Sequence, residues 1–177
     1  QPWMIAVASA AVRDRLAAGI SGEMMMGRMK PDLPYDGRYQ GVQRERQIAS
    51  AEALYATLGI AREDKVGRQA QFMQNYVFFG APHVAFFFLP PGCGVREAAD
   101  LGMCAQTFML ALASMGYGSC PQTSLSFHPD LVRAEFDLAP ESQLLFGVSF
   151  GSIDTTAAVN RVRVPRDLAR CTLIRED

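Results

Sequence analysis

The feature that most constrains the fold is the apolar run HVAFFFL at residues 83–89. It has the length of a strand, and because its residues are apolar without alternation, it predicts a strand buried on both faces. Pro90 and Pro91 follow at once and end it, since proline cannot donate a hydrogen bond within a sheet. The run QLLFGVSFG at residues 143–151 has the same character. The sequence therefore predicts two buried strands.

Helices and shorter strands are predicted around this pair from periodicity and end signals. The expected elements are a strand at 3–9, a helix at 10–19 ended by Gly19, helices at 44–60 (ended by Gly59), 62–75, 95–116 and 128–136, and a short strand entering a loop at 117–125. Between the first two helices, residues 21–41 are rich in glycine, proline and methionine. They predict an excursion from the core, either lining a variable pocket with its methionines or forming a mobile loop.

Composition limits the class of protein. The 177 residues are 49% hydrophobic and 20% charged, which is typical of one globular domain. Seventeen basic and 18 acidic residues give a net charge of −1, so neither nucleic acid nor a membrane surface is an expected partner. No apolar run reaches the roughly 20 residues of a membrane helix.

The cysteines and histidines point away from metal chemistry. The two histidines, His83 and His128, lie far apart in sequence, and the cysteines form no C-x-x-C pair. No metal site is expected. Four scattered thiols in a chain with a full core fit a reducing, cytoplasmic environment better than a disulfide framework. The cysteines are Cys93, Cys104, Cys120 and Cys171.

Common catalytic and nucleotide-binding motifs are missing. In GYGSCPQ at 116–122, Cys120 stands where a serine nucleophile elbow needs its second glycine. Neither G-x-G-x-x-G nor the phosphate-binding loop G-x-x-x-x-G-K-[ST] occurs. If a nicotinamide nucleotide is used, it has no Rossmann site of its own.

Polar groups stand at the ends of three apolar elements: Gln74 with Asn75, PQTS at 121–124, and NRVR at 160–163. An amide offers a donor and an acceptor, which suits the edge of a heterocycle. Two arginines at alternate positions of an extended segment share one face and suit a phosphate. Together they indicate a phosphorylated heterocycle, although taken singly Asn75 could be a cap and the arginines solvated.

Five stretches together resemble a known family. They are QPW at the start, NYVFFGAP at 75–82, residues 99–132, LLFGVSFGSID at 144–154 and NRVRVPRDL at 160–168. Spread along the whole chain, they are similar to the FMN-dependent nitroreductases, in the branch that acts on nitroaromatic compounds. The resemblance implies an α+β fold, with a small mixed, mainly antiparallel sheet flanked by helices in an intertwined homodimer. The small residues of the 95–116 helix favour such a subunit interface.

The resemblance also implies roles for individual residues. Asn75 would hydrogen-bond the pyrimidine edge of the flavin, and a loop with a backbone N–H aimed at flavin N5 would cover its other face. Arg161 and Arg163 would hold the FMN phosphate. Gln1 and Pro2 would reach the cofactor of the partner subunit. The loop residues are Pro121, Gln122, Thr123 and Ser124.

The implied chemistry belongs to the cofactor. NADPH or NADH would give hydride to FMN and be replaced by a nitroaromatic or quinone acceptor, in a ping-pong cycle without catalytic side chains. A flavin or enoyl-type reductase on the same fold, and a binding module that has lost FMN, are the alternatives. The chain departs from the family in one respect. No basic, serine-containing segment precedes Gln1, so we expect a single domain, residues 1–177, whose FMN site lacks that contribution.

Overall fold

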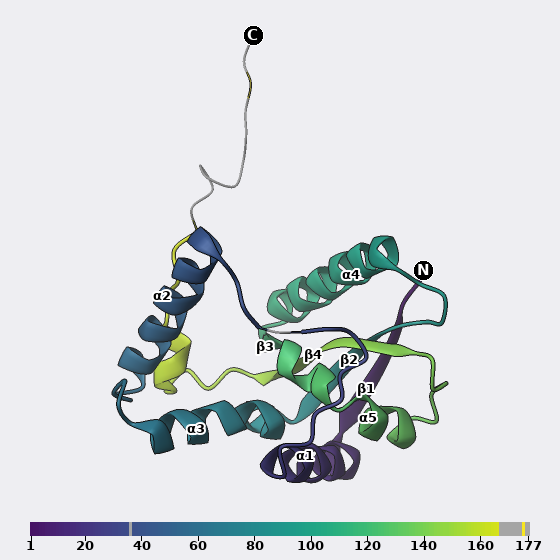
Figure 1. Ribbon diagram of the computed structural model, residues 1–177, viewed down its shortest axis with the longest axis horizontal. Coiled ribbons are helices and arrows are strands. Elements are labelled where there is room, and N and C mark those ends of the chain that lie inside the picture. The colour runs from purple at the N-terminus through teal and green to yellow at the C-terminus, as the bar shows by residue number, and fades with distance from the viewer. Residues whose placement is uncertain (36, 167–174, 176–177) are drawn as a thin grey trace. The chain divides into compact units, whose positions relative to one another are not determined.

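The computed structural model describes residues 1–35, 37–166 and 175 (Figure 1). The chain divides into two compact units, residues 1–36 with 69–153 and residues 37–68 with 154–177. The α-helices are α1 (Ala10–Met25), α2 (Gly41–Thr57), α3 (Lys65–Met73), α4 (Val95–Ser114) and α5 (Pro129–Glu135). The strands are β1 (Met4–Ser9), β2 (His83–Leu89), β3 (Tyr117–Gln122) and β4 (Gln143–Ser152). Three short 3-10 helices are η1 (Gln74–Gly80), η2 (Thr123–Phe127) and η3 (Ala158–Arg161).

The first unit is built on a four-stranded sheet in the order β1-β2-β4-β3. All three strand pairings among the described residues are antiparallel. The two apolar runs form the two central strands, as the sequence predicts. The α+β class and the small, mainly antiparallel sheet between helices are confirmed.

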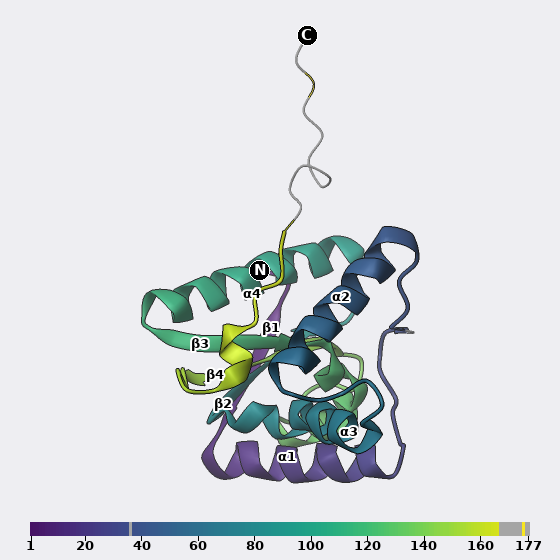
Figure 2. The same ribbon diagram turned by 90° about the vertical axis from the view of Figure 1, so that its left-hand side faces the viewer.

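Helices cover both faces of this sheet, with α4 on one face and α1 and α5 on the other (Figures 1 and 2). Alternate side chains of β2 point to opposite faces of the sheet and pack in two separate apolar layers. Phe86 and Phe88 pack in the layer with α1 and α5. Phe87 packs in the layer with α4, stacked on Phe146 with ring centroids 5.1 Å apart. Because both faces are covered, β2 needs an apolar residue at every position, which explains its continuous run.

The prediction that Gly19 ends the first helix is wrong, because α1 continues to Met25. A side-chain carbon added at Gly19 would lie 3.5 Å from Leu131 Cδ1 in α5. Gly19 therefore lies inside the helix beside α5, where a side-chain carbon would make an ordinary van der Waals contact, and it is not a stop. Gly59, by contrast, follows the end of α2 with φ of +68°, as expected of a helix-ending glycine.

The excursion after α1 is anchored through Asp32. Its carboxylate accepts hydrogen bonds from Arg133 Nη1 at 2.7 Å and from the backbone N–H of Leu144 at 2.8 Å. Arg133 also donates to Ser142 O and to Asp130. This buried arginine ties the excursion to α5 and to the start of β4. The methionines differ, since Met24 packs against the core while Met25 is 80% exposed.

In the second unit, α2 packs against η3. No residue of α2 is fully buried.

The cysteines form no disulfide in the described part of the chain, since Cys93, Cys104 and Cys120 are free thiols and Cys171 lies outside the described residues. In the described part of the chain, no helix combines the length and the hydrophobicity needed to span a membrane.

Candidate functional site

Asn75 lies near the start of η1, the tight segment that joins α3 to β2. The sequence predicts that a helix runs to Asn75, but α3 ends at Met73. Within η1, Phe78 and Phe79 have φ of 58° and 51°, in the left-handed region that non-glycine residues avoid. Phe78 is fully buried, so packing against the core maintains this strained backbone.

Arg13 of α1 holds the strained segment from outside. Its Nη2 donates to Val77 O at 2.6 Å and its Nε donates to Ala81 O at 3.0 Å. The guanidinium carbon also lies 5.2 Å from the centre of the Phe78 ring, within cation–π range. One side chain therefore fixes both ends of the turn that follows Asn75.

Gln122 and Ser124 meet Asn75 from the end of β3 and from η2. Gln122 Nε2 donates to Asn75 O at 2.9 Å and approaches Asn75 Oδ1 at 3.3 Å. Ser124 Oγ donates to the same Oδ1 at 3.2 Å. The structure thus joins three of the predicted site residues, Asn75, Gln122 and Ser124, in one hydrogen-bonded network. Ser149 of β4 joins it through a hydrogen bond to Gln122, and we call these four residues the amide cluster.

Two backbone carbonyls determine how the amides in this cluster are turned. Asn75 O can only accept, so the nitrogen end of Gln122 must face it, and the oxygen end then faces the hydroxyl of Ser149, which donates to it. Asn75 Nδ2 donates to Phe72 O at 2.9 Å, which turns Asn75 Oδ1 toward Gln122 and Ser124. The orientation of Asn75 therefore follows from fixed acceptors.

Gly147 of β4 lets η2 approach the sheet closely. A side-chain carbon at this position would lie 2.6 Å from Leu125 Cδ1 and 3.2 Å from Leu125 Cβ. Leu125 is fully buried over the glycine, and Gln122 pairs with Gly147 in the β3–β4 register. The glycine thus sets the position of the segment that carries Gln122 and Ser124.

The amide cluster leaves one N–H of the Asn75 side chain without an acceptor in the described part of the chain. Asn75 Oδ1 already receives two donors, whereas Nδ2 carries two hydrogens and donates one of them to Phe72. The free N–H belongs to a half-buried side chain. The sequence predicts that this amide offers a ligand both a donor and an acceptor. In the structure, only the donor remains available.

The other predicted residues of the first unit lie in exposed or edge positions. Gln1 is exposed and Pro2 half-buried, directly before β1. Pro121 is exposed on β3, opposite Val148. Thr123 is exposed at the start of η2, and its carbonyl accepts from Ser126 Oγ at 2.8 Å. None of these four residues makes a side-chain hydrogen bond with Asn75 among the described residues.

Arg161 and Arg163 belong to the second unit, and both are exposed. Arg163 Nη1 donates to Asn160 O and Val162 O, each at 2.9 Å, and neither arginine pairs with a carboxylate in the described part of the chain. Val162 lies between them and turns inward. The extended segment predicted at 160–163 is only partly correct, because Asn160 and Arg161 belong to the 3-10 helix η3 and extended backbone begins at Val162.

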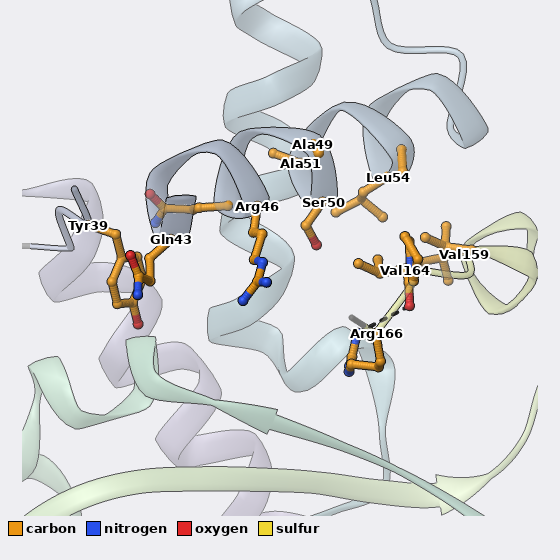
Figure 3. A pocket seen from close by; sticks show the side chains of 14 residues that line it. Tyr39, Gln43, Arg46, Ala49, Ser50, Ala51, Leu54, Val159, Val164 and Arg166 are labelled. Carbon is orange, nitrogen blue, oxygen red and sulfur yellow. Dashed lines mark hydrogen bonds between the residues drawn. The ribbon is translucent and has the colours of Figure 1, made fainter. Parts of the chain in front are cut away.

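The inward side lines a cavity of about 870 Å³ beside α2. Leu54 of α2 faces Val159 and Val164 across it, and Arg46 and Arg166 also line it (Figure 3). Arg166 donates to Val164 O at 3.2 Å. The cavity is large enough for part of a small-molecule ligand.

Sequence reasoning missed two residues of the site. Ser149, 2% exposed, interrupts the apolar run of β4, and a hydroxyl within a buried strand signals that a polar partner lies nearby. Arg13 gives no such signal, because an arginine in an amphipathic helix is ordinarily solvated. Its two carbonyl partners lie 64 and 68 positions away in the chain.

Comparison with known proteins gives consistent results. Residues 1–152 match the nitroreductase family. The chain is 47% identical to nitroreductase NfnB of Mycolicibacterium smegmatis, over 94% of this chain and 71% of that protein. It is 32% identical to a 4-nitrobenzoate reductase of Pseudomonas putida, over 96% of this chain and 75% of that protein. The crystal structure of FMN-dependent NfnB from Mycobacterium smegmatis in complex with NADPH matches with a TM-score of 0.93 and 45% identity, covering 99% of this chain and 79% of that one.

Proposed function

Because the chain belongs to the nitroreductase family, we propose that it is an FMN-dependent oxidoreductase that passes electrons from NADPH or NADH to nitroaromatic or quinone acceptors. The single observation that carries the proposal is the amide cluster, which presents an oriented Asn75 N–H from η1, beside the ends of the strands. Such a donor is suited to a carbonyl on the edge of a flavin.

The residues present fit FMN in two separate respects. On the first unit, the free N–H of Asn75 matches a flavin carbonyl, and Ser124 and Gln122 prevent the amide from turning over. On the second unit, Arg161 and Arg163 present guanidinium groups that no described carboxylate neutralises, as a phosphate requires. Bound FMN would supply the two-electron redox chemistry, which no side chain of the chain provides.

The protein's own contribution is to bind and orient. The cluster holds one donor in place, so that it need not reorganise when charge develops on a carbonyl. Pro121 and Thr123, exposed on either side of Gln122, belong to the segment that we assign to the covering loop. Gln1 and Pro2 would contact the cofactor of a second subunit.

We further propose a cytoplasmic homodimer, for which the outer face of α4 is the strongest support. Met103 and Leu110 of α4 are 62% and 60% exposed, and Met115, directly after the helix, is 63% exposed, while the other side of the helix packs on the sheet. Exposed apolar residues gathered on one helix face favour a protein interface. Sedimentation at low micromolar concentration that gives only a 19.4 kDa species would contradict the dimer.

The proposed function is tested first by a spectrum and an assay. Purified protein supplied with FMN should show bound flavin absorbance and should oxidise NADPH or NADH only when a nitroaromatic or quinone acceptor is added. Protein that refuses FMN would overturn the proposal and favour a binding module. Protein that binds FMN but reduces only free flavin or an enoyl substrate would overturn the choice of acceptor.

The phosphate site is tested by two titrations. In the double variant Arg161→Ala, Arg163→Ala, FMN should bind at least about 10-fold more weakly, because charge-assisted hydrogen bonds contribute roughly 1.5 to 3 kcal/mol each. Riboflavin, which lacks the phosphate, should bind the wild type and the variant equally. As a matched control, Arg15→Ala removes an exposed arginine of the first unit and should leave both affinities unchanged. Equal loss of both flavins would place the phosphate elsewhere.

A further inference from the structure

Two buried rings of the first unit carry polar atoms that the amide cluster does not use. The hydroxyl of Tyr76, which is fully buried, and Nε2 of His128, which is 6% exposed, have no hydrogen-bond partner among the described residues. The two rings contact each other edge to face, with centroids 6.0 Å apart. Because buried polar groups are nearly always hydrogen-bonded, two unsatisfied atoms on contacting rings call for a functional explanation.

This ring contact joins the same two segments as the amide cluster. Tyr76 follows Asn75 in η1, and His128 directly follows η2. Near the start of η2, Ser124 Oγ donates to Asn75 Oδ1, and the contact between Tyr76 and His128 lies beyond its other end. The segment η2 is therefore held against η1 on both sides, once by a hydrogen bond and once by two rings.

Tyr76 also contacts the residue that accepts from the Asn75 amide. Asn75 Nδ2 donates to Phe72 O, and the Phe72 ring packs edge to face against Tyr76 with centroids 5.5 Å apart. The Tyr76 ring thus contacts both Phe72 and His128. A movement of His128 would therefore disturb the backbone beside Asn75 and the carbonyl to which its side chain donates.

The charged groups near His128 leave a protonated imidazole without a free counter-ion. His128 lines a cavity of about 450 Å³ together with Glu23 of α1, Arg28 and Lys30 of the excursion, and Asp130 of α5. Both carboxylates are already paired, Glu23 with Arg28 at 2.9 Å and Asp130 with Arg133 and Lys30. From η1, Tyr76 offers only a neutral phenol, because burial raises its pKa to about 12. Burial also lowers the pKa of His128, and Glu23 only partly opposes this effect.

We propose that His128 and Tyr76 are positioning residues for Asn75, and that protonation of His128 weakens the binding of a flavin. The inference rests on the proposed function, in which Asn75 donates to a flavin carbonyl. The neutral imidazole packs against Tyr76, so η2 and η1 hold the amide in one orientation. A buried imidazolium is stabilised by moving toward water in the cavity, which loosens this contact and frees the Asn75 side chain to turn. Flavin affinity therefore falls as pH decreases through the pKa of His128.

The test follows the affinity for riboflavin against pH in the full chain. Riboflavin is the probe, because the phosphate of FMN changes its own charge with a pKa of about 6. Between pH 8 and 5.5, the wild type should lose about threefold or more in affinity by fluorescence quenching, because the protonated form binds more weakly. His128→Gln should lose less than about 1.5-fold, since its amide takes up no proton. Circular dichroism at each pH separates weaker binding from unfolding.

The matched control is His83→Gln, because His83 is the other of the two histidines of the chain. It is half-buried at the start of β2, where Nδ1 forms a hydrogen bond of 2.6 Å with Ser9 Oγ, and it has no part in the amide cluster. This variant should keep the wild-type pH profile. A profile that is flat in His83→Gln but unchanged in His128→Gln would assign the pH dependence to the wrong imidazole and overturn the proposal.

A second readout uses the wild type without flavin and does not depend on the folding of a variant. In nuclear magnetic resonance spectra, the side-chain N–H signals of Asn75 should shift with pH at the same midpoint as the ring protons of His128. Constant Asn75 signals while His128 titrates would overturn the coupling. Tyr76→Phe keeps the ring but removes an oxygen that can accept from a protonated Nε2, so it should move the midpoint to lower pH. An unchanged midpoint would overturn the role of the Tyr76 hydroxyl.

Other outcomes separate this inference from the proposed function. Parallel pH profiles of riboflavin affinity in the wild type and in His128→Gln would overturn the inference and leave the proposed function intact. Failure of the wild type to bind either FMN or riboflavin at pH 8 would overturn the proposed function. The Asn75 signals would then still decide whether His128 positions that side chain.

Discussion

The side-chain amide of Gln122 donates a hydrogen bond to the backbone carbonyl of Asn75 at 2.9 Å, although the two residues lie 47 positions apart in the chain. Gln122 is 4% exposed and belongs to β3, whereas Asn75 lies near the start of η1, the segment before β2. Because the Ser149 hydroxyl of β4 donates a hydrogen bond to the oxygen of the Gln122 amide, the sheet itself holds Asn75 in place. The donor that we assign to the flavin edge is therefore positioned by tertiary structure.

Replacing Asn75 with leucine should weaken FMN binding by about 1 to 3 kcal/mol, because a flavin carbonyl would then face an apolar group. Asn75 is only half-buried, so the free energy of unfolding should change less than the affinity. Fluorescence titration with FMN and urea denaturation measure the two quantities. An unchanged FMN affinity with reduced stability would make Asn75 a structural cap of η1 only.

Replacing Gln122 with methionine should affect the free energy of unfolding more than the affinity for FMN. The variant keeps the side-chain length but leaves Asn75 O and the Ser149 hydroxyl without their partner in a buried place. The expected loss of stability is about 2 to 3 kcal/mol, since each unsatisfied buried polar group costs roughly 1 to 3 kcal/mol. Urea denaturation gives the value. A loss below about 0.5 kcal/mol would show that the amide cluster is weakly held.

Arg13→Met should destabilise the protein by about 2 to 4 kcal/mol, because two carbonyls of the strained turn lose a charged donor. Arg15→Met, two residues along the same helix, is a matched control. Arg15 is 59% exposed and pairs with Glu135 at the surface, so its removal should cost less than about 1 kcal/mol. Similar costs for the two variants would refute a special role for Arg13.

Gly147→Ala should cost about 1 to 3 kcal/mol, since the added methyl group would meet buried Leu125 at 2.6 Å and force η2 away from the sheet. Because η2 follows Gln122, FMN affinity should fall as well. In the control Gly22→Ala, the new methyl group meets nothing within 4 Å inside α1 and should stabilise the helix by up to about 1 kcal/mol. We expect the midpoint temperature of thermal unfolding to fall in Gly147→Ala and to rise in Gly22→Ala.

How far the sequence predicts the fold depends on whether a signal is local. The run at 83–89 coincides with β2, because burial on both faces demands an apolar residue at each position. The helix predicted at 128–136 corresponds to α5 (Pro129–Glu135), whose first turn holds Pro129, as is common for proline at a helix start. Gly19 misleads, because α1 continues through it to Met25 and packs against the core through Leu16, Ala17 and Ile20, which a local helix-ending signal does not reflect.

The candidate site divides in the same way. The amides and hydroxyls at element ends, such as Gln122 and Ser124, are visible in the sequence and do meet Asn75. What the sequence does not show is which lone pairs and hydrogens these groups use on one another. Consequently the acceptor expected of Asn75 is already occupied. The strained η1 backbone and the role of Arg13 also arise only from contacts over more than 60 positions.

His128 should make the stability of the protein depend on pH. Burial lowers the pKa of this imidazole, partly opposed by the nearby Glu23 carboxylate, and its Nε2 has no hydrogen-bond partner among the described residues. In the unfolded chain the pKa is about 6.5, so between the folded and unfolded values the unfolded chain binds more protons. Stability should therefore fall as pH decreases through about 6.5 and level off below the folded pKa.

Urea denaturation of the wild type and His128→Gln at pH 8, 6.5 and 5 tests this expectation. The variant should lose less stability between pH 8 and 5, because its side chain takes up no proton. The Asp130 carboxyl, whose pKa Arg133 lowers, contributes stability that is lost only as pH falls below about 4, so it does not confuse the comparison. Parallel pH profiles for the two proteins would show that His128 is protonated as readily when folded as when unfolded.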